Sequence, residues 1–528
     1  MNEFIGKVIK KNQIVAPFLG ARLSFIQGQD PMGMLNVGEQ VFSMILPGLN
    51  NVTERIRYYS FYCWFFGTYA KWNGSEDPKE QRKFIRRAEY LLALVAAKKD
   101  LSGIAGITEA RKNYGPSKSV FSLKEGTGEL KNSTENTYWK NPRGVFGQNY
   151  VSSLRQIGLI RDKGEETGVF IRTAFEIENV VTGKDLENAF IESTSQNNRE
   201  LFLKCIKAGE ISNEDLVSIS DDFQMIEVPT NKTENKLLLN MLVSPDSPTS
   251  ENKTFFRKNT IRLYLNQLNI NTTNLTVIDF VDHAYREKGK DAESAEPTLL
   301  AWYYYQLSQY WHIVSTSCLC HLLTALQNVS GSGWIEESEL VRLITDDVLE
   351  ELKKLVSSDP KILFTELAEP EDEALTISRN TITKNYSLGL ANAFLLLKKI
   401  IIENSENIQE LKDFSKKHMI TSNSDFVASY DDLQEKSNLA MREFIHYFLV
   451  KYVINRHQIV ALNKMNDTQS TEKFLREDGY IRFIESIDYG FSSPRLGNLI
   501  QFLNDLDIIS NSGNLTSNGM KLSKDLNE

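Results

Sequence analysis

The chain has 528 residues, more than one hydrophobic core usually serves, so we expect several domains. With 41% apolar and 24% charged residues, its composition excludes a wholly disordered protein. The net charge of −9 excludes a protein that coats nucleic acid with its entire surface, but it leaves room for a local basic patch.

The N-terminal part predicts a turn at residues 30–33, a short helix over 37–46 and a second helix over 53–66. The second helix is apolar around most of its circumference, as in a buried central helix. Arg55 and Arg57 near its start then need partners, because burying an unpaired charge is costly.

Residues 79–99 predict an amphipathic helix with Phe84, Leu91 and Val95 on its apolar face. The same segment carries a run of basic residues, which we interpret as a solvated helix face: Lys79, Arg82, Lys83, Arg86 and Arg87. Residues 101–140 are rich in Gly, Ser and Thr and predict no regular element.

Helices are expected over 184–208 and 213–223, and a Pro- and Ser-rich loop at 244–250 suggests a domain boundary. From residue 255 onward helix follows helix, with segments at 298–327, 336–357, 388–405 and 433–465. We therefore expect a mainly α, multi-domain helical protein with two winged-helix-like modules that carry short β-hairpins. The predicted domains are 1–125 (helical), 126–243 (winged-helix-like with a helical extension), 253–465 (helical) and 466–528 (winged-helix-like).

The two modules are predicted from a local pattern that occurs twice. One copy runs from Asn141-Pro142-Arg143 to Ile160, and the other from Ser493-Pro494-Arg495 to Ile509. Counting back from the final Ile aligns Asn149 with Asn498 and Leu154 with Leu503. Each copy continues into a polar, Gly-containing segment that can turn back as a hairpin. A helix followed by such a hairpin resembles winged helix-turn-helix domains, which engage nucleic acid or other proteins.

For the C-terminal module, residues 476–487 are expected to supply an earlier helix and 508–516 the wing. Its candidate contact residues are Arg495, Asn498, Gln501 and Asn504. Asp505 and Asp507 sit at the helix end and the wing has no Lys or Arg. Since phosphate contacts supply most DNA affinity, packing or partner docking is the alternative role.

The mid-chain copy is more basic, which suits phosphate contact better. Its candidate residues for contact with nucleic acid or a partner are Arg143, Gln148, Asn149, Arg155, Arg161 and Lys163. The alternative is a small structural domain that bridges two helical halves.

No catalytic residue or cofactor site is predicted. The sequence has no P-loop and no Gly-x-Ser-x-Gly motif, and the Gly-x-Gly at 126–128 follows no apolar strand and lacks a third glycine. Asp282-His283 is best interpreted as a polar cluster at a helix end, and His312 and His321 as core histidines, so we expect no metal site. The cysteines follow neither a zinc nor a disulfide spacing: Cys63, Cys205, Cys318 and Cys320.

The chain begins without the charged start and apolar run of a signal peptide, and its apolar stretches are too short for a bilayer. We therefore expect a cytoplasmic protein with no membrane partner.

The segments Gly28–Gly33 and Leu46–Trp64 resemble uncharacterised bacterial proteins of anti-phage defence loci. This resemblance implies other protein subunits as partners, with DNA as a further candidate, and carries no known chemistry. The same region suggests a small anionic site formed by Asp30, Arg55, Arg57 and Tyr58. Alternatively, the arginines cap helices or pair with Asp30 or Glu54.

We therefore expect a non-enzymatic component of a bacterial defence complex that engages DNA or a partner protein through its winged-helix-like modules. Two alternatives remain. One is a nuclease or nucleotide-processing effector with a site built from dispersed residues, and the other is a transcription regulator.

Overall fold

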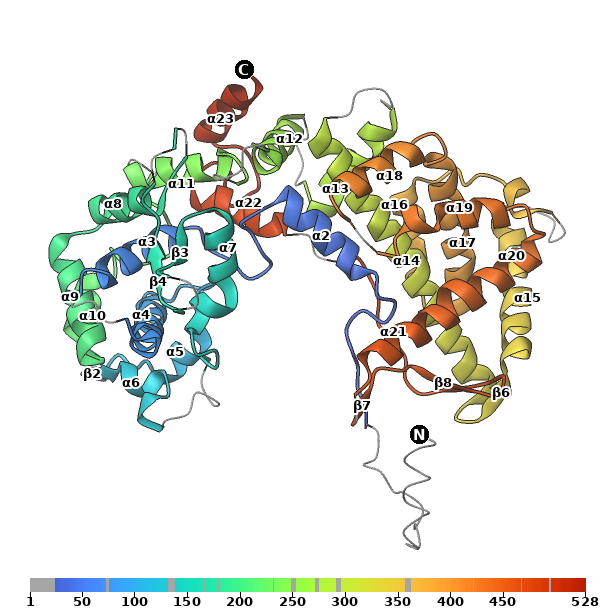
Figure 1. Ribbon diagram of the computed structural model, residues 1–528, viewed down its shortest axis with the longest axis horizontal. Helices are drawn as coiled ribbons and strands as arrows, with labels where there is room; N and C mark the ends of the chain where they lie inside the picture. Colours follow the sequence, from blue (N-terminus) through green and yellow to red (C-terminus); the bar gives the residue numbers. More distant parts are fainter. Residues whose placement is uncertain are drawn as a thin grey trace, which may run out of the picture. The chain divides into compact units, whose positions relative to one another are not determined.

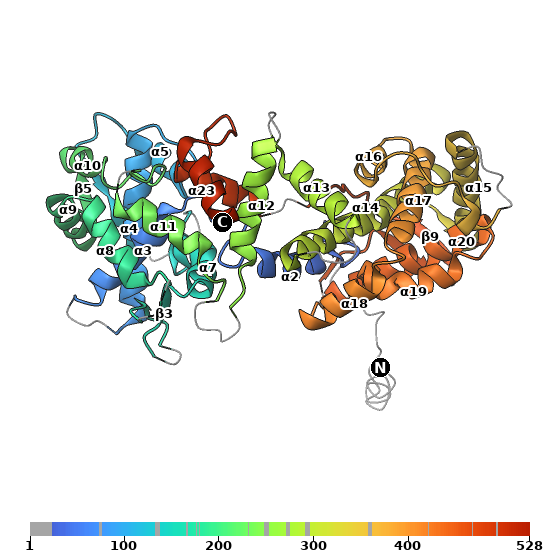
Figure 2. The same cartoon turned by 90° about the horizontal axis from the view of Figure 1, so that it is seen from above.

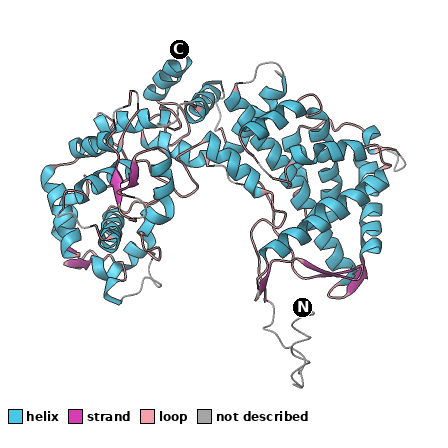
Figure 3. Cartoon of the chain, viewed as in Figure 1, coloured by secondary structure: helices cyan, strands magenta, loops and turns pink. Residues whose placement is uncertain are grey.

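The structure, a computed structural model, describes residues 24–528 apart from a set of short gaps. The residues not described are 1–23, 73–75, 132–137, 165–166, 176, 179, 231, 248–252, 271–274, 291–295, 357–361, 421, 467 and 493–494. Helices dominate the described part, and its strands form only two- and three-stranded sheets (Figure 3). The predicted mainly helical fold class is confirmed.

The chain divides into two compact units, each made of segments that are not contiguous in sequence. The first unit comprises Met1–Glu39 and Tyr304–Ser492, and the second comprises Gln40–Tyr303 and Ser493–Glu528. Both occurrences of the repeated pattern lie in the second unit, and we name them the mid-chain copy (residues 141–183) and the C-terminal copy (residues 495–519). The four predicted domains follow other boundaries, and their independent folding stays a prediction.

The first unit is built around most of α14 (Pro297–Ser330), a single helix that covers the segment expected at 298–327. Its other helices are α15 (Glu337–Val356), η3 (Phe364–Glu366), α16 (Ala374–Asn380), α17 (Tyr386–Glu403), α18 (Ile408–Lys417), α19 (Phe426–Lys436), α20 (Met441–Phe448), η4 (Leu449–Asn455) and α21 (Arg456–Lys464) (Figure 1). Its strands are β1 (Ser24–Phe25), β6 (Trp334–Glu336), β7 (Gln469–Ser470), β8 (Phe474–Glu477) and β9 (Tyr480–Phe483).

In this unit β1 pairs parallel with β7, and β9 lies between β6 and β8 in an antiparallel sheet. The predicted turn at residues 30–33 is present and is held by α21. His457 Nδ1 lies 2.9 Å from the Pro31 carbonyl while its Nε2 accepts from the backbone N–H of Lys473 (3.0 Å). Burial lowers the pKa of His457 to about 4, so this histidine is a neutral structural group.

One predicted element in this unit is wrong. Residues 476–487, expected as a helix, form the end of β8, a tight turn and β9. The turn residues Asp478 and Gly479 have φ of 48° and 83°, as a type I′ hairpin turn requires at both central positions. The Asp-Gly dipeptide is a strong hairpin signal, and it overrides the helical appearance of the flanking residues.

The second unit begins within α2 (Leu35–Ile45) and contains most of the remaining elements. They are α3 (Arg57–Tyr69), α4 (Pro78–Lys98), α5 (Ile107–Asn113), β2 (Val120–Ser122), α6 (Leu123–Gly126), η1 (Glu129–Lys131), η2 (Phe146–Tyr150), α7 (Val151–Gln156), β3 (Ile160–Asp162), β4 (Phe170–Arg172), α8 (Gly183–Ser193), α9 (Gln196–Ala208), β5 (Glu210–Ser212), α10 (Asn213–Ile219), α11 (Thr233–Val243), α12 (Phe256–Ile270), α13 (Val277–Lys290), α22 (Leu496–Asp505) and α23 (Ser517–Asn527). Sheets β2–β5 and β3–β4 are antiparallel, and α23 packs on α12 (Figure 2).

Helix α3 is the core of the second unit, as its apolar sequence predicts, although it starts four residues later than expected. Phe61 and Trp64 contact Phe190 of α8 and Phe202 of α9, with ring centroids 5.2 to 6.0 Å apart. Full burial of one such side chain contributes about 2 to 3 kcal/mol, so this aromatic cluster fixes α3 firmly.

The loop at 244–250, predicted as a domain boundary, lies inside the second unit as far as the structure describes it. The fully buried Arg257 ties it down by donating to the carbonyls of Met241, Leu242 and Ser244 at 2.7 to 3.3 Å. Because these carbonyls stand at the end of α11, a guanidinium group satisfies acceptors that the helix leaves open. The described residues 244–247 are therefore held in place despite their linker-like composition.

Among the described residues, no helix combines the length and the apolar character that a membrane span requires.

Candidate nucleic-acid interface

The repeated pattern ends its helix in the same way in both copies. In the mid-chain copy, the backbone N–H of Leu159 donates to the carbonyl of Leu154 at 2.9 Å. In the C-terminal copy, the equivalent bond joins Ile508 to Leu503 at 2.8 Å. Bonds that reach back five residues close a helix whose next residue is left-handed, and here Gly158 and Asp507 have φ of 81° and 59°.

The equivalence continues beyond the hairpin, through a threonine in each copy. Thr173 donates its backbone N–H (2.9 Å) and its hydroxyl (3.1 Å) to the Leu159 carbonyl, and Thr516 does the same to Ile508 at 3.1 and 3.2 Å. Each threonine hydroxyl also accepts from the backbone N–H of a helical glycine at 3.0 Å. The two copies therefore share a backbone geometry: helix, hairpin, then a second helix.

The shared glycines are required by close approach. A β-carbon on Gly183 would collide with the Leu159 carbonyl oxygen, and one on Gly519 would collide with that of Ile508. The second helix of each copy, α8 or α23, is thereby held directly against the helix end that precedes the hairpin.

Both copies form hydrogen bonds with the loop that connects α2 to α3. Asn50 donates to the carbonyl of Asn149 (2.6 Å), and the aligned Asn498 donates to the carbonyl of Asn50 (2.5 Å). Gly48 donates its N–H to Gln156 of the mid-chain copy (2.9 Å). One loop thus connects the two copies and fixes their separation.

A buried carboxylate positions the start of the mid-chain copy. Glu89 of α4 accepts hydrogen bonds from the backbone N–H groups of Val145 (2.8 Å) and Phe146 (2.7 Å), and from Tyr62 (2.9 Å) and Trp139 (3.0 Å). Burial raises the pKa of Glu89 to about 7, against the effect of these four donors. The carboxylate satisfies the open N–H groups at a helix start and so joins η2 to α4.

The mid-chain copy presents basic side chains around Phe170 of β4. The guanidinium carbons of Arg143 and Arg155 lie 5.3 and 4.9 Å from the centre of this ring, at cation–π distance. Arg155 also pairs with Asp162 of β3. Within the described ranges no carboxylate pairs with Arg143, so two predicted site residues meet here and one keeps its full charge.

Helix α4 adds two arginines to this surface. A β-carbon placed on Gly168, in the β3–β4 turn, would lie 3.4 Å from Nη2 of Arg82 and 3.9 Å from Nη2 of Arg143. The Nε of Arg82 is buried without a hydrogen-bond partner. Arg86, one turn along, donates to the Pro142 carbonyl (2.6 Å). Burial lowers the pKa of Arg86; Glu129 and Glu89 act against this shift, and Arg87 and Arg82 add to it.

We call Arg82, Arg86 and Arg143 the arginine cluster. In the part of the chain that the structure describes, none of the three has a carboxylate within ion-pair distance. Like charges held together in partly buried positions repel each other, and a bound anion would relieve this repulsion. Guanidinium groups are well suited to phosphate, which they can contact with two parallel hydrogen bonds.

A second basic surface lies on the β3–β4 hairpin. A cavity of about 400 Å³ is lined by Arg161, Lys163, Lys71 and Arg172 together with apolar residues, and by no acidic residue. Lys71 and Arg172 are both paired with the buried Glu187, and Lys163 pairs with the exposed Glu76 (2.7 Å). Arg161 is exposed, so this predicted site residue is available to a partner.

The candidate residues of the C-terminal copy are used inside the unit. The amide of Asn498 binds the Asn50 carbonyl, that of Gln501 binds Asp505 (2.9 Å) and that of Asn504 binds the Ile509 carbonyl (3.1 Å). Arg495 lies 3.4 Å from the carbonyl of Leu49. These contacts are those of a packed helix and match the alternative role given to this copy.

The members of the predicted anionic site have other partners. Arg55 pairs with Asp505 (2.7 Å), and the buried Arg57 forms two bonds of 3.3 Å with the buried Glu234. Both arginines are thus paired, but with neither Asp30 nor Glu54. Asp30 belongs to the first unit, where it accepts from the N–H groups that open α2.

Gln148 and Asn149, expected to contact bases, line a cavity with Tyr58 that is distinct from the basic surfaces. The interpretation of residues 79–87 as a solvated helix face is wrong for Arg87, which is buried and paired with Glu129 (2.5 Å). Because of the same interpretation, Arg82 and Arg86 were not predicted as site residues. Their spacing of four residues places them on one helix face, which is the signal that could have found them.

Within the described ranges, no group of three or more His, Cys, Asp or Glu side chains is arranged to hold a metal ion. Comparisons with protein families, with curated proteins and with solved structures find no match to this chain.

Proposed function

We propose that this chain binds the phosphate backbone of nucleic acid through the mid-chain copy and the adjoining face of α4. In this proposal it is a cytoplasmic, non-enzymatic subunit of a bacterial anti-phage defence complex, and both copies are winged-helix-like modules. Membership of such a complex is supported only by the resemblance of residues 28–64 to proteins of defence loci.

The observation that carries the proposal is the arginine cluster. Arg82 and Arg143 converge on the glycine of a hairpin turn without a carboxylate near enough to neutralise them among the described residues. In winged-helix proteins the hairpin contacts phosphates, which is where this cluster stands relative to the helix α7. A surface that gathers unpaired guanidinium groups gains Coulomb energy and releases counterions when it binds a polyanion.

The β3–β4 hairpin adds further basic side chains to the proposed binding surface. Arg161 and Lys163 of the same hairpin line the cavity of about 400 Å³, and Arg155 lies over the ring of Phe170 in β4. Because phosphate contacts carry no sequence information, the expected binding is weakly selective and strongly salt-dependent. The overall charge of −9 confines such binding to this surface.

The test is fluorescence anisotropy with a labelled duplex of about 20 base pairs at roughly 50 mM salt. The double variant Arg82→Ala/Arg143→Ala should lose about 100-fold in affinity, since each phosphate contact contributes on the order of 1 kcal/mol or more. The control Arg111→Ala/Lys112→Ala removes the same charge from α5 of the same unit and should change affinity less than about threefold.

Two results would overturn the proposal. One is a wild-type protein that binds neither DNA nor RNA at low salt, which would favour an acidic protein partner. The other is equal loss in the cluster variant and the control, which would mean that only net charge matters. Incubation with DNA or RNA and Mg²⁺ or Mn²⁺ should leave both substrates intact. Cleavage would replace the proposal by the nuclease alternative.

A further inference from the structure

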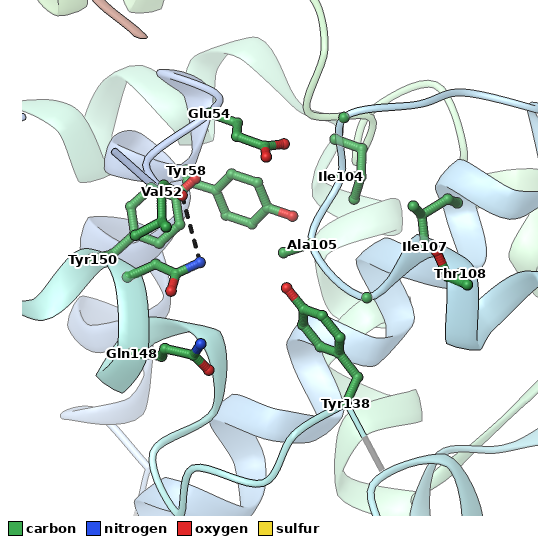
Figure 4. Close-up of a pocket in the computed structure, with 13 residues that line it drawn as sticks. Val52, Glu54, Tyr58, Ile104, Ala105, Ile107, Thr108, Tyr138, Gln148 and Tyr150 are labelled. Carbon is green, nitrogen blue, oxygen red and sulfur yellow. Dashed lines mark hydrogen bonds between the residues drawn. The ribbon is translucent and has the colours of Figure 1, made fainter. Parts of the chain in front are cut away.

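A cavity of about 390 Å³ lies in the second unit, away from the arginine cluster. It is lined by residues 103–108 and by Val52, Glu54, Tyr58, Tyr138, Gln148, Asn149 and Tyr150. Figure 4 shows the hydroxyl groups of Tyr58 and Tyr138 pointing toward each other into this space, with Glu54 and Gln148 at its sides. Its volume is in the usual range for sites that hold a small organic molecule.

Asn149 lines the cavity and is held in place by one side-chain hydrogen bond. The residue is only 8% exposed, and its Nδ2 donates to the Val52 carbonyl at 3.4 Å, which appears as the dashed line in Figure 4. Since a carbonyl can only accept, this bond fixes the orientation of the amide. Its Oδ1 is then buried without a partner in the described part of the chain. Such an atom costs about 1 to 3 kcal/mol unless a donor reaches it.

Tyr58 adds a second polar group held in place. Its ring is packed against Tyr62 and Tyr150, with centroids 5.8 and 5.0 Å away, so its position is fixed before any ligand arrives. No hydrogen bond from its hydroxyl to another described residue is seen. A fixed hydroxyl that faces a cavity can donate to a ligand acceptor or accept from a ligand donor.

The charge around the cavity selects the kind of ligand. Burial, and then the negative charges of Glu89 and Glu54, raise the pKa of Tyr58, and burial followed by the same two carboxylates raises that of Tyr138. No Lys or Arg is among the lining residues. Arg55, whose Nε donates to the carbonyl of the lining residue Gly103 (3.4 Å), is paired with Asp505. The lining itself carries a carboxylate and no cation, which disfavours phosphate and favours a neutral ligand rich in hydrogen-bond donors.

We infer that this cavity binds a nucleobase carrying an exocyclic amino group, as part of a nucleoside rather than a nucleotide. Glu54 accepts from amino and ring N–H groups, while the Gln148 amide and the tyrosine hydroxyls donate to ring nitrogens or carbonyls. A flat heterocycle with donors and acceptors along its edge matches this arrangement. The site shares no residue with the arginine cluster and does not rest on the proposed function.

The test is isothermal titration calorimetry of the full chain with adenosine, guanosine, cytidine and uridine. At least one of the three amino-bearing nucleosides should bind with a Kd below about 1 mM, and uridine should bind at least about tenfold more weakly. The 5′-monophosphate of the best ligand should also bind more weakly than its nucleoside, because the site lacks a cation.

Glu54→Gln and Tyr138→Phe should each lower the affinity about tenfold, and both positions are exposed enough to leave folding unchanged. The control Glu125→Gln replaces an exposed carboxylate of the same unit outside the cavity and should leave the affinity unchanged. The double variant Arg82→Ala/Arg143→Ala should also bind the nucleoside normally. Absence of binding by every nucleoside, uridine binding as tight as the others, or unchanged affinity in both cavity variants would overturn the inference.

Discussion

The mid-chain copy and the C-terminal copy have the same backbone and different surroundings. Both close a helix through a left-handed residue, both use a threonine to hold the carbonyl at the helix end, and both place a glycine where no β-carbon fits. The mid-chain copy then presents arginines that no described carboxylate neutralises. The polar side chains of the C-terminal copy instead form hydrogen bonds with the loop before α3. The shared residues therefore build the backbone of the motif, and the residues that differ decide which groups each copy can contact.

The largest expected difference concerns position 505 and its counterpart in the mid-chain copy. The Asp505 side chain is 1% exposed and accepts from Arg55 (2.7 Å), so Asp505→Ala leaves a mostly buried arginine unpaired. We expect a loss of about 3 kcal/mol or more in the free energy of unfolding. Gln156→Ala removes two bonds at the aligned position, of which the one to Ser43 is long (3.4 Å), and should cost about 1 kcal/mol. Urea unfolding followed by circular dichroism measures both, and equal losses would contradict the packing role of the C-terminal copy.

Stability should also depend on pH through the C-terminal copy. Burial raises the pKa of Asp505 from 3.8 to about 6, against the lowering effect of Arg55. The folded state therefore binds this proton more tightly than the unfolded state does. The contribution is full below pH 3.8 and is lost as the pH rises to about 6, by about 3 kcal/mol. In Asp505→Asn this part of the pH profile should vanish, whereas Gln156→Ala should keep it. An unchanged profile in Asp505→Asn would show that the carboxyl titrates normally.

The shared geometry predicts parallel effects of one substitution in the two copies. Thr173→Val and Thr516→Val keep the side-chain shape and remove the hydroxyl that binds the carbonyl at the helix end. We expect a cost of about 1 to 2 kcal/mol at the buried Thr173 and somewhat less at the half-buried Thr516. Ser512→Ala, in the exposed turn of the C-terminal copy, should change stability little. A large effect at one threonine with none at the other would break the equivalence.

The smallest expected effect concerns the charge that the mid-chain copy presents to nucleic acid. Asp162→Asn removes the carboxylate that pairs with the half-exposed Arg155, so nucleic-acid affinity should rise about three- to tenfold. The free energy of unfolding should change by less than about 1 kcal/mol, because exposed ion pairs contribute little. Glu165 and Glu166 follow in the hairpin sequence and lie outside the described residues. Anisotropy measurements with the same duplex test the prediction, and unchanged or lower affinity would place the nucleic acid elsewhere.

How far the sequence predicted the fold depends on whether the signal was local. The apolar sequence of α3 and the periodicity of α4 identified both helices, because the apolar pattern of a packed helix lies within the helix's own sequence. The sequence also indicated that Arg55 and Arg57, near the start of a buried helix, need partners for their charges. It did not indicate the partners, since Asp505 and Glu234 are 450 and 177 residues away and nothing in the chain marks them.

The candidate site was predicted in part for the same reason. Alignment from the final isoleucine found the repeated helix end, but the hairpins differ in length, so counting does not bring Thr173 onto Thr516. Arg143 was found because it lies within the pattern. Arg82 was seen only as one charge of a basic helix, because which face of α4 the mid-chain copy covers is decided by tertiary packing.

The central claim is that only one of two equivalent motifs meets nucleic acid. Hydrogen–deuterium exchange of the full chain, with and without a saturating duplex at low salt, tests it directly. The account predicts slower exchange in Ile160–Arg172 and around Arg82–Arg86, with no change over residues 496–519. Protection of the C-terminal copy, or of neither copy while the duplex is bound, would contradict it.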